Sequence, residues 1–232
     1  MRVIVLCEES QAITKAFRAR GHEAYSCDLK DCSGGHPEWH FKGDAFQIIK
    51  ENPNWDLIIA HPPCFNLSVS GARHFEKKRV DGSQRESIEF FCKILSLDVP
   101  RLCVENPINI ISGDYIKKYY PDLCEKYGLP VKPTQVIQPY EYGNPSRKTT
   151  CLWLKGLPNL VPTNIVKPEL ITYTCKNGKK ATFSKDYIVS GDRGTKRSKT
   201  YEGIAEAMAM QWGDGEYPKV ERKGLLKYVR TE

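Results

Sequence analysis

Short apolar runs alternate with segments of helical spacing over the first half of this 232-residue chain. The runs are Arg2–Leu6, Glu23–Cys27, Asp56–Ala60 and Arg101–Val104. Strand-like runs separated by helical patterns predict βαβ units, and therefore an α/β fold with a mostly parallel sheet and helices on both faces. Because the carboxyl ends of parallel strands share one edge of a sheet, the side chains that follow these runs are expected to line one crevice. They are Glu8, Asp28, Cys64 and Glu105.

The remaining patterns divide the chain into three parts. Helical spacing occurs at Gln11–Arg20, Ala45–Lys50, Glu86–Leu97 and Thr200–Gln211, and further strand-like pieces occur at Gln135–Gln138 and Thr149–Leu154. We expect a first domain over residues 1–155, a small insertion over 156–193, and a segment over 194–232 whose helix returns to the first domain. The insertion is rich in Pro, Thr and Lys, and residues 176–180 within it predict a hairpin turn.

Composition narrows the class of protein. No apolar stretch reaches the length of about 18 residues that a membrane span needs, and the first apolar run meets Glu8 and Glu9 too early for a signal peptide. The nine cysteines include no Cys-x-x-Cys pair, which is typical of reduced thiols in a cytoplasmic protein. From residue 145 onward, 17 Lys and Arg stand against 9 Asp and Glu. This basic part indicates either a polyanionic partner or a solvated, lysine-rich surface.

The segment Ala60–Gly71 carries the strongest chemical signal. Pro62 and Pro63 stiffen the turn after a predicted strand and hold Cys64 at the sheet edge. A thiol attacks as the thiolate, which cationic neighbours favour, so we interpret Cys64 as a nucleophile, with a buried core thiol as the alternative. A polar stretch follows that could close as a lid over a bound anion. Its basic residues are Arg73, His74, Lys77, Lys78 and Arg79.

In these motifs the sequence resembles the cytosine-C5 DNA methyltransferase family, and its short, phage-type members in particular. The family has Pro-Cys after its fourth strand, then a Ser and a Gly, and later a Glu-Asn. The matching residues here are Pro63-Cys64, Ser68, Gly71 and Glu105-Asn106. Residues 142–148 are similar to the family's Gly-x-Pro motif with its Arg-containing strand, and residues 6–17 occupy the place of its first motif. The resemblance spans most of residues 1–155 and implies a Rossmann-like class I methyltransferase with a small target-recognition insertion.

The resemblance also implies how the catalytic residues divide the work. Cys64 would add to C6 of cytosine, which makes C5 nucleophilic enough to accept a methyl group. Glu105 would contact ring N3 and the exocyclic amine, and Arg147 would hold the base or orient the carboxylate. In a duplex, the cytosine would first be flipped out of the stack. Further residues expected to contact the substrate are Pro63, Ser68 and Asn106.

S-adenosyl-L-methionine is the cofactor that the resemblance implies. Asp28 would accept hydrogen bonds from the ribose hydroxyls, and Asp44 would bind the adenine amine. The other residues expected to bind the cofactor are Cys7, Glu8, Glu9, Ser10 and Pro62. The chain departs from the family in its first motif, where residues 8–11 (Glu-Glu-Ser-Gln) replace the usual glycines. It also lacks the family's Gln after Pro145, and residues 194–207 match the final motif only faintly.

Three alternatives to a C5 DNA methyltransferase stay open. The insertion between Arg147 and Gly194 is shorter than the family's usual recognition region, which favours free cytidine nucleotides or RNA over DNA with a flipped cytosine. The segment His61–Cys64 is a near match to N4-cytosine and N6-adenine methyltransferases, which place an aromatic residue where Cys64 stands. A nucleic-acid binder without catalysis would explain the lost glycines.

One spacing is compatible with zinc, in the compact segment between Cys27 and His40. Cys27 falls in a predicted strand, and neither ligand pair has a spacing familiar from zinc sites, so no metal is predicted. The four side chains are Cys27, Cys32, His36 and His40.

Overall fold

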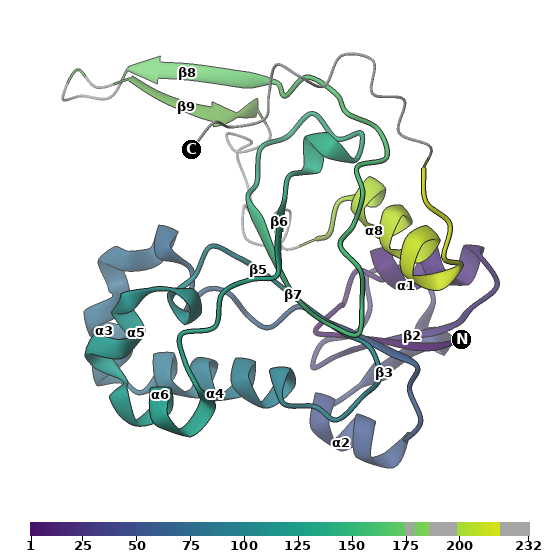
Figure 1. Cartoon of the computed structure of the whole chain (residues 1–232), viewed down its shortest axis with the longest axis horizontal. Coiled ribbons are helices and arrows are strands. Elements are labelled where there is room, and N and C mark those ends of the chain that lie inside the picture. The colour runs from purple at the N-terminus through teal and green to yellow at the C-terminus, as the bar shows by residue number, and fades with distance from the viewer. Residues whose placement is uncertain (175–177, 179, 186–198, 219–232) are drawn as a thin grey trace.

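The computed structural model describes residues 1–174, 178, 180–185 and 199–218 (Figure 1). Its main sheet consists of β1 (Arg2–Leu6), β2 (Glu23–Asp28), β3 (His40–Lys42), β4 (Leu57–Ala60), β5 (Leu102–Pro107), β6 (Gln135–Ile137) and β7 (Thr150–Lys155). The seven strands lie in the order β3-β2-β1-β4-β5-β7-β6, and β7 runs antiparallel to both of its neighbours. The order extends the 3-2-1-4-5 arrangement of doubly wound α/β sheets. The predicted Rossmann-like fold, a mostly parallel sheet with helices on both faces, is therefore confirmed.

Helices cover both faces of this sheet. They are α1 (Ala12–Ala19), α2 (Ala45–Glu51), α3 (Phe75–Val80), α4 (Ser83–Leu95), α5 (Asp114–Tyr119), α6 (Pro121–Tyr127) and α8 (Glu202–Met208). Each helix and strand expected from the first half of the sequence is present within a few residues of its predicted bounds. Four elements escaped prediction because they are short: β3, α3, α5 and α6.

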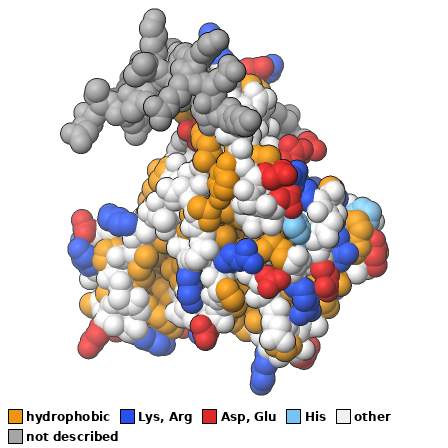
Figure 2. Space-filling view, turned by 45° about the vertical axis from the view of Figure 1, so that its right-hand side comes forward, with side chains coloured by type: hydrophobic (Ala, Val, Ile, Leu, Met, Phe, Trp, Pro, Cys, Tyr) orange, Lys and Arg blue, Asp and Glu red, His pale blue; other side chains and the backbone are white. Residues whose placement is uncertain are grey.

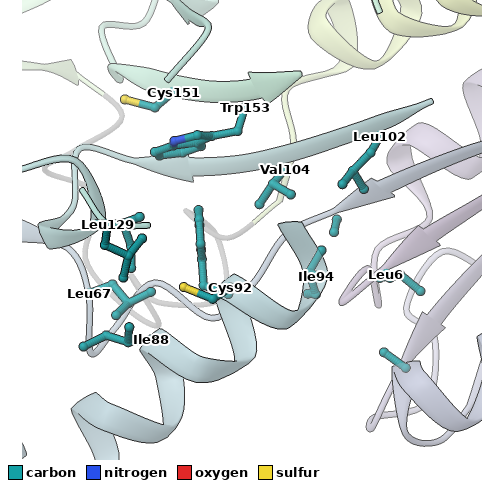
Figure 3. Close-up of a cluster of buried hydrophobic side chains, with 14 of the residues drawn as sticks. Leu6, Leu67, Ile88, Cys92, Ile94, Leu102, Val104, Leu129, Cys151 and Trp153 are labelled. Atoms are coloured by element: carbon teal, nitrogen blue, oxygen red, sulfur yellow. The ribbon is translucent and has the colours of Figure 1, made fainter. Parts of the chain in front are cut away.

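The central strands are buried on both faces, which is why their sequences read as continuous apolar runs. Alternate residues of β1 point to opposite faces: Ile4 packs on the side of α4, whereas Val3 and Val5 pack on the side of α1 and α8. Figure 3 shows the first of these clusters, in which Ile88 and Cys92 of α4 face the sheet. Burial of each such aliphatic side chain contributes roughly 1.5–3 kcal/mol. The two clusters therefore fix the sheet and, with it, the position of the strand ends.

The insertion forms a separate two-stranded sheet, seen at the top of Figure 1. Its strands β8 (Leu170–Thr174) and β9 (Lys180–Ser184) pair antiparallel, as a hairpin requires. The hairpin is fastened at its base, where Lys185 N–H donates to the carbonyl of Glu169 and Glu169 N–H donates to that of Pro145. Cys175 and Gly194 lie outside the described residues. Of the predicted turn at 176–180, only residues 178 and 180 are described.

No helix within the described ranges has the length and apolar character to cross a membrane. On the face that Figure 2 shows, Lys and Arg side chains are interspersed with Asp and Glu over the main body. This mixture agrees with the near balance of charge in the first 144 residues, which have 18 Lys and Arg and 19 Asp and Glu.

Candidate active site

The register of the parallel strands places four side chains level with one another at the carboxyl edge of the sheet. Leu6 pairs with Cys27 on one side and with Ala60 on the other, and Ala60 pairs with Val104. The residue that follows each of them therefore belongs to one row across β2, β1, β4 and β5. In that order, the row is Asp28, Cys7, His61 and Glu105.

His61 and Glu105 are bonded to each other within this row. His61 Nδ1 lies 2.8 Å from Glu105 Oε2, and the two side chains are 11% and 15% exposed. Burial by itself would raise the pKa of Glu105. The hydrogen bond from His61 and the positive charges of His61 and Lys148 together outweigh burial and lower the pKa below its ordinary value of 4.5. Glu105 is therefore a carboxylate at neutral pH, with its proton donor beside it.

Cys64 lies at the end of a corner, residues 62–64, that hydrogen bonds hold at both ends. The thiol is exposed and so does not belong to the core. The carbonyl of Cys64 accepts hydrogen bonds from the N–H groups of Leu67 and Ser68, at 3.0 and 2.8 Å, which closes a tight turn after the cysteine. On the other side, Asn106 Nδ2 donates to the carbonyl of Pro62 at 2.7 Å. The corner that carries the thiol is thereby tied to the strand that carries Glu105.

Two residues expected to contact the substrate form hydrogen bonds with other protein groups instead. Asn106 is 1% exposed, and its side-chain oxygen accepts from Asn109 Nδ2 at 3.0 Å, so both ends of its amide are occupied. Ser68 is also buried, and its hydroxyl lies 2.9 Å from that of Ser70. The Asn106 side chain therefore holds the corner in place, whereas the Ser68 hydroxyl contacts the segment that follows it. The lid expected after Cys64 is folded as a 3₁₀ helix, Val69–His74, followed by α3.

Arg147 lies on an exposed loop before β7, where its backbone contacts the insertion. Its N–H donates to Ser184 Oγ at 2.6 Å, and Ser184 Oγ donates to the Arg147 carbonyl at 3.2 Å. The charges that lower the pKa of Glu105 come from His61 and Lys148, not from Arg147. Sequence reasoning missed both of these basic residues. The signal for His61 was available, since it follows its strand by one residue just as Glu105 follows Val104.

A cavity of about 320 Å³ opens between α4, the ends of β1 and β2, and the start of α2. Pro63, not Pro62, lines it, because Pro62 is buried with its carbonyl bound to Asn106. The other lining residues that bear on ligand binding are Cys7, Asp28, Asp44, Phe65, Glu86, Ser87 and Phe90. Neither Cys64 nor Glu105 lines this cavity, so the thiol and the cavity occupy different places along the same edge.

The cavity fits the adenosine end of S-adenosyl-L-methionine. Its volume lies within the range of small-molecule pockets, roughly 300–1,000 Å³. Phe65 and Phe90 offer aromatic surface for a base, and Asp28 and Asp44 are acceptors for hydroxyl and amine groups. One oxygen of Asp28 accepts from Lys30 N–H at 2.9 Å, and one of Asp44 caps α2, so each carboxylate keeps its second oxygen for a ligand.

Glu8 does not face this cavity. It is 4% exposed, and its carboxylate accepts from the N–H groups of Ile13 and Thr14 and from the Thr14 hydroxyl, at 2.7, 3.3 and 2.7 Å. Burial raises the pKa of Glu8, although His61 and these hydrogen bonds act in the opposite direction. The first N–H groups of a helix are the donors that an anionic ligand would use. In α1 they are taken by Glu8, which therefore has a structural role.

The turn after β1 adopts left-handed backbone without glycine. Cys7 and Gln11 have φ values of 58° and 57°, a region that glycine occupies more readily. The buried Gln11 side chain donates to the His36 carbonyl at 2.8 Å and accepts from its N–H at 3.1 Å. Glu9 and Ser10 are half-buried in the same turn, and the carbonyl of Glu9 accepts from Ser33 N–H. Side-chain and loop contacts thus hold a turn that the family builds with glycines.

Three of the four residues with zinc-like spacing have other surroundings. Cys27 is buried, His36 stacks on Trp39, and His40 lies between the Ser26 hydroxyl and the Lys30 carbonyl. Among the residues that the structure describes, no three His, Cys, Asp or Glu side chains are grouped so as to hold a metal ion.

No protein-family model matches this sequence, and no curated protein matches it. Several solved structures are similar in fold. One is described as a DNA modification methyltransferase encoded within an E. coli prophage, with 15% identity and a TM-score of 0.47 over 72% of this chain and 52% of that one. The Entamoeba histolytica methyltransferase EhMeth has 14% identity and a TM-score of 0.46, covering 73% and 58%. The S. pombe Dnmt2 methyltransferase has 10% identity and a TM-score of 0.38, covering 68% and 50%. This chain thus spans little more than half the length of these structures.

Proposed function

We propose that this chain is an S-adenosyl-L-methionine-dependent methyltransferase that methylates C5 of cytosine in DNA through a bond between Cys64 Sγ and ring C6. The observation that carries the proposal is the hydrogen bond from Asn106 to Pro62, which ties the corner holding an exposed thiol to the strand holding a buried, ionised carboxylate. A nucleophile and a proton-handling group fixed to each other are what addition to a pyrimidine ring requires.

The protein side of the reaction then follows from the site. Addition of the Cys64 thiolate to C6 forms the S–C6 bond at the expense of the C5=C6 double bond and shifts electron density toward C5 and N3, where a proton must be held. Once C5 carries the methyl group, loss of the C5 proton to a base re-forms the double bond, breaks the S–C6 bond and releases the thiolate. Glu105 would share the proton at N3 and accept from the exocyclic amine. Arg147, on the loop before β7 whose backbone is bonded to Ser184 of the insertion, would contact the substrate rather than orient Glu105.

The residues around the 320 Å³ cavity would hold S-adenosyl-L-methionine, which supplies an electrophilic methyl group. Asp28 would accept from the ribose hydroxyls and Asp44 from the adenine amine, while Phe65 and Phe90 contact the adenine ring. Cys7 and Pro63 line this cavity, and Pro63 directly precedes Cys64 in the sequence.

The test is methylation with labelled S-adenosyl-L-methionine, offered duplex DNA, single strands and dCMP separately, followed by mass spectrometry of the nucleosides. We expect 5-methylcytosine. A 5-fluorocytosine substrate should trap a covalent protein adduct that Cys64→Ser lacks. Cys32→Ser is the matched control, because Cys32 is partly exposed on the loop after β2 and should leave the adduct intact. Label on N4 of cytosine or N6 of adenine, or an adduct at another cysteine, would contradict the proposal.

A smaller substrate is the second candidate, and the size of the insertion favours it. Strands β8 and β9 have five residues each, which gives room for few base contacts. Polymeric DNA and RNA are separated from free nucleotides by the salt dependence of binding, because several phosphate contacts give a steep slope. Methylation of dCMP at a rate equal to that of DNA would favour this candidate.

A further inference from the structure

His61 is the member of the strand-end row for which the proposed reaction has no role. Its side chain is largely buried and contacts Glu105 on β5, and its charge acts on the pKa values of both Glu105 and Glu8. Its Nδ1 contacts Glu105, whereas its Nε2 is buried without a hydrogen-bond partner among the described residues. Since Nδ1 is the ring nitrogen with an acceptor beside it, the proton is placed on Nδ1, which donates to Glu105 Oε2.

This hydrogen bond fixes the position of one carboxylate oxygen of Glu105, and the second oxygen stays available to a substrate. Oε2 is held at 2.8 Å from His61, while Oε1 accepts no hydrogen bond from any described residue. A carboxylate gripped at one oxygen cannot rotate about its last torsion without losing the bond. Its second oxygen therefore keeps one direction, which is the requirement for a group that must meet a ring edge.

The other charged and titratable groups around the pair do not replace this bond. Glu8 is committed to the first turn of α1, and Lys148, from the loop before β7, acts on Glu105 through its charge. Cys103 of β5 and Cys151 of β7 have pKa values raised by burial and by the charge of Glu105, so both are neutral thiols. Among the described residues, His61 is thus the group that donates a hydrogen bond to the Glu105 side chain.

We propose that His61 is a positioning residue, which holds Glu105 oriented and ionised in the empty site until the base arrives. The inference rests on the proposed function and adds a consequence to it. Without such a partner, burial would raise the pKa of the carboxyl group, and the group would be free to turn. With His61 in place, Glu105 takes its proton only when cytosine N3 lies beside it, so that base binding is accompanied by uptake of a proton.

Two substitutions separate the hydrogen bond from the charge. In His61→Asn, the amide nitrogen can occupy the place of Nδ1 and donate to Oε2, but the side chain has no charge. His61→Ala removes both. We expect His61→Ala to lower kcat by about tenfold or more with little change in KM for DNA, and His61→Asn to recover most of kcat. His36→Asn is the control, because His36 is partly exposed and contacts Glu38 and Trp39 instead.

A second measurement does not depend on turnover. The side-chain carboxyl carbon of Glu105 is followed by NMR against pH and is assigned by its absence in Glu105→Gln. We expect it to titrate at a higher pH in His61→Ala than in the unaltered protein, by about one unit or more. The alkaline limb of the rate should move in the same direction, since the protonated carboxyl then persists to higher pH. A purely structural role for His61 would move neither.

The outcomes distinguish this inference from the proposed function. If Glu105 titrates at the same pH with and without His61, or if His61→Asn is as slow as His61→Ala, the positioning role is overturned. If the titration moves as expected but no 5-methylcytosine forms on any substrate, the hold of His61 on Glu105 stands and the proposed methyltransferase activity fails.

Discussion

Asn106 donates a hydrogen bond of 2.7 Å from its side chain to the carbonyl of Pro62, 44 residues away in the sequence. We expect Asn106→Asp to break this tie, because a carboxylate oxygen would then face the carbonyl oxygen of Pro62. Loss of a buried hydrogen bond with repulsion in its place should cost about 1–3 kcal/mol in the free energy of unfolding. Urea denaturation measures this cost, and 5-fluorocytosine trapping should slow because the Cys64 corner loosens. An unchanged free energy of unfolding and an unchanged trapping rate would show that the Cys64 corner keeps its structure without this hydrogen bond.

Asp28 and the cavity beside it give a prediction about cofactor affinity. Asp28→Asn keeps the acceptor for Lys30 N–H but loses the charge and one acceptor oxygen on the ribose side. The affinity for S-adenosyl-L-methionine should fall about tenfold, which corresponds to about 1.4 kcal/mol. Isothermal titration calorimetry measures it, with Asp31→Asn as the control, since Asp31 is exposed and pairs with Lys42. Equal affinities for the unaltered protein and Asp28→Asn would show that Asp28 does not bind the cofactor.

Glu8 is expected to affect stability rather than cofactor binding. Glu8→Ala leaves the first N–H groups of α1 without their acceptor, which should lower the free energy of unfolding by about 1–2 kcal/mol. Because burial raises the pKa of Glu8 above 4.5, the folded protein holds the proton more tightly than the unfolded chain. The stability that Glu8 contributes is therefore present below that value and lost as the pH rises through its folded value. Denaturation at pH 5 and pH 8 should show the larger cost at pH 5.

Lys148 and Arg147 are neighbours in the sequence with different expected effects on Glu105. Lys148 lowers the pKa of Glu105 through its charge, after the larger effects of burial and His61. Lys148→Met should raise the pH at which Glu105 takes a proton, by less than His61→Ala does. Arg147→Met should leave that pH unchanged and weaken substrate binding instead. An NMR titration of the Glu105 carboxyl carbon in both variants decides between them, and the reverse ranking would restore Arg147 as the partner of Glu105.

The sheet could be predicted because each of its inner strands has a strong local pattern. Burial on both faces makes β1, β4 and β5 continuous apolar runs, and each ends at a polar residue that marks the edge. The short β3 has three residues and exposed or half-exposed side chains, so it has no such pattern. Its pairing with β2 comes from tertiary contact and not from local preference.

The direction in which each polar side chain at this edge points could not be predicted from the sequence. Glu8 and Asp28 look alike in the sequence, as acids that follow a strand. Their difference lies in rotation: Glu8 turns back into the start of its own helix, while Asp28 lines the cavity. Asn106 was likewise expected to face a ligand and faces Pro62 instead. Such choices depend on which backbone groups lack partners in the folded state, and a linear sequence does not show those.

The pair of hydrogen bonds between Ser184 and the backbone of Arg147 bears on how this protein could be redesigned. Ser184 ends β9, and its hydroxyl both donates to and accepts from Arg147, so the base of the hairpin is fixed while its strands lie mostly exposed. An engineer could therefore graft a larger reading surface onto the outer hairpin, provided that Ser184 and the Pro145–Glu169 bond are kept. Under the proposed function, the strand-end row would keep its place, and target preference would become an exchangeable module.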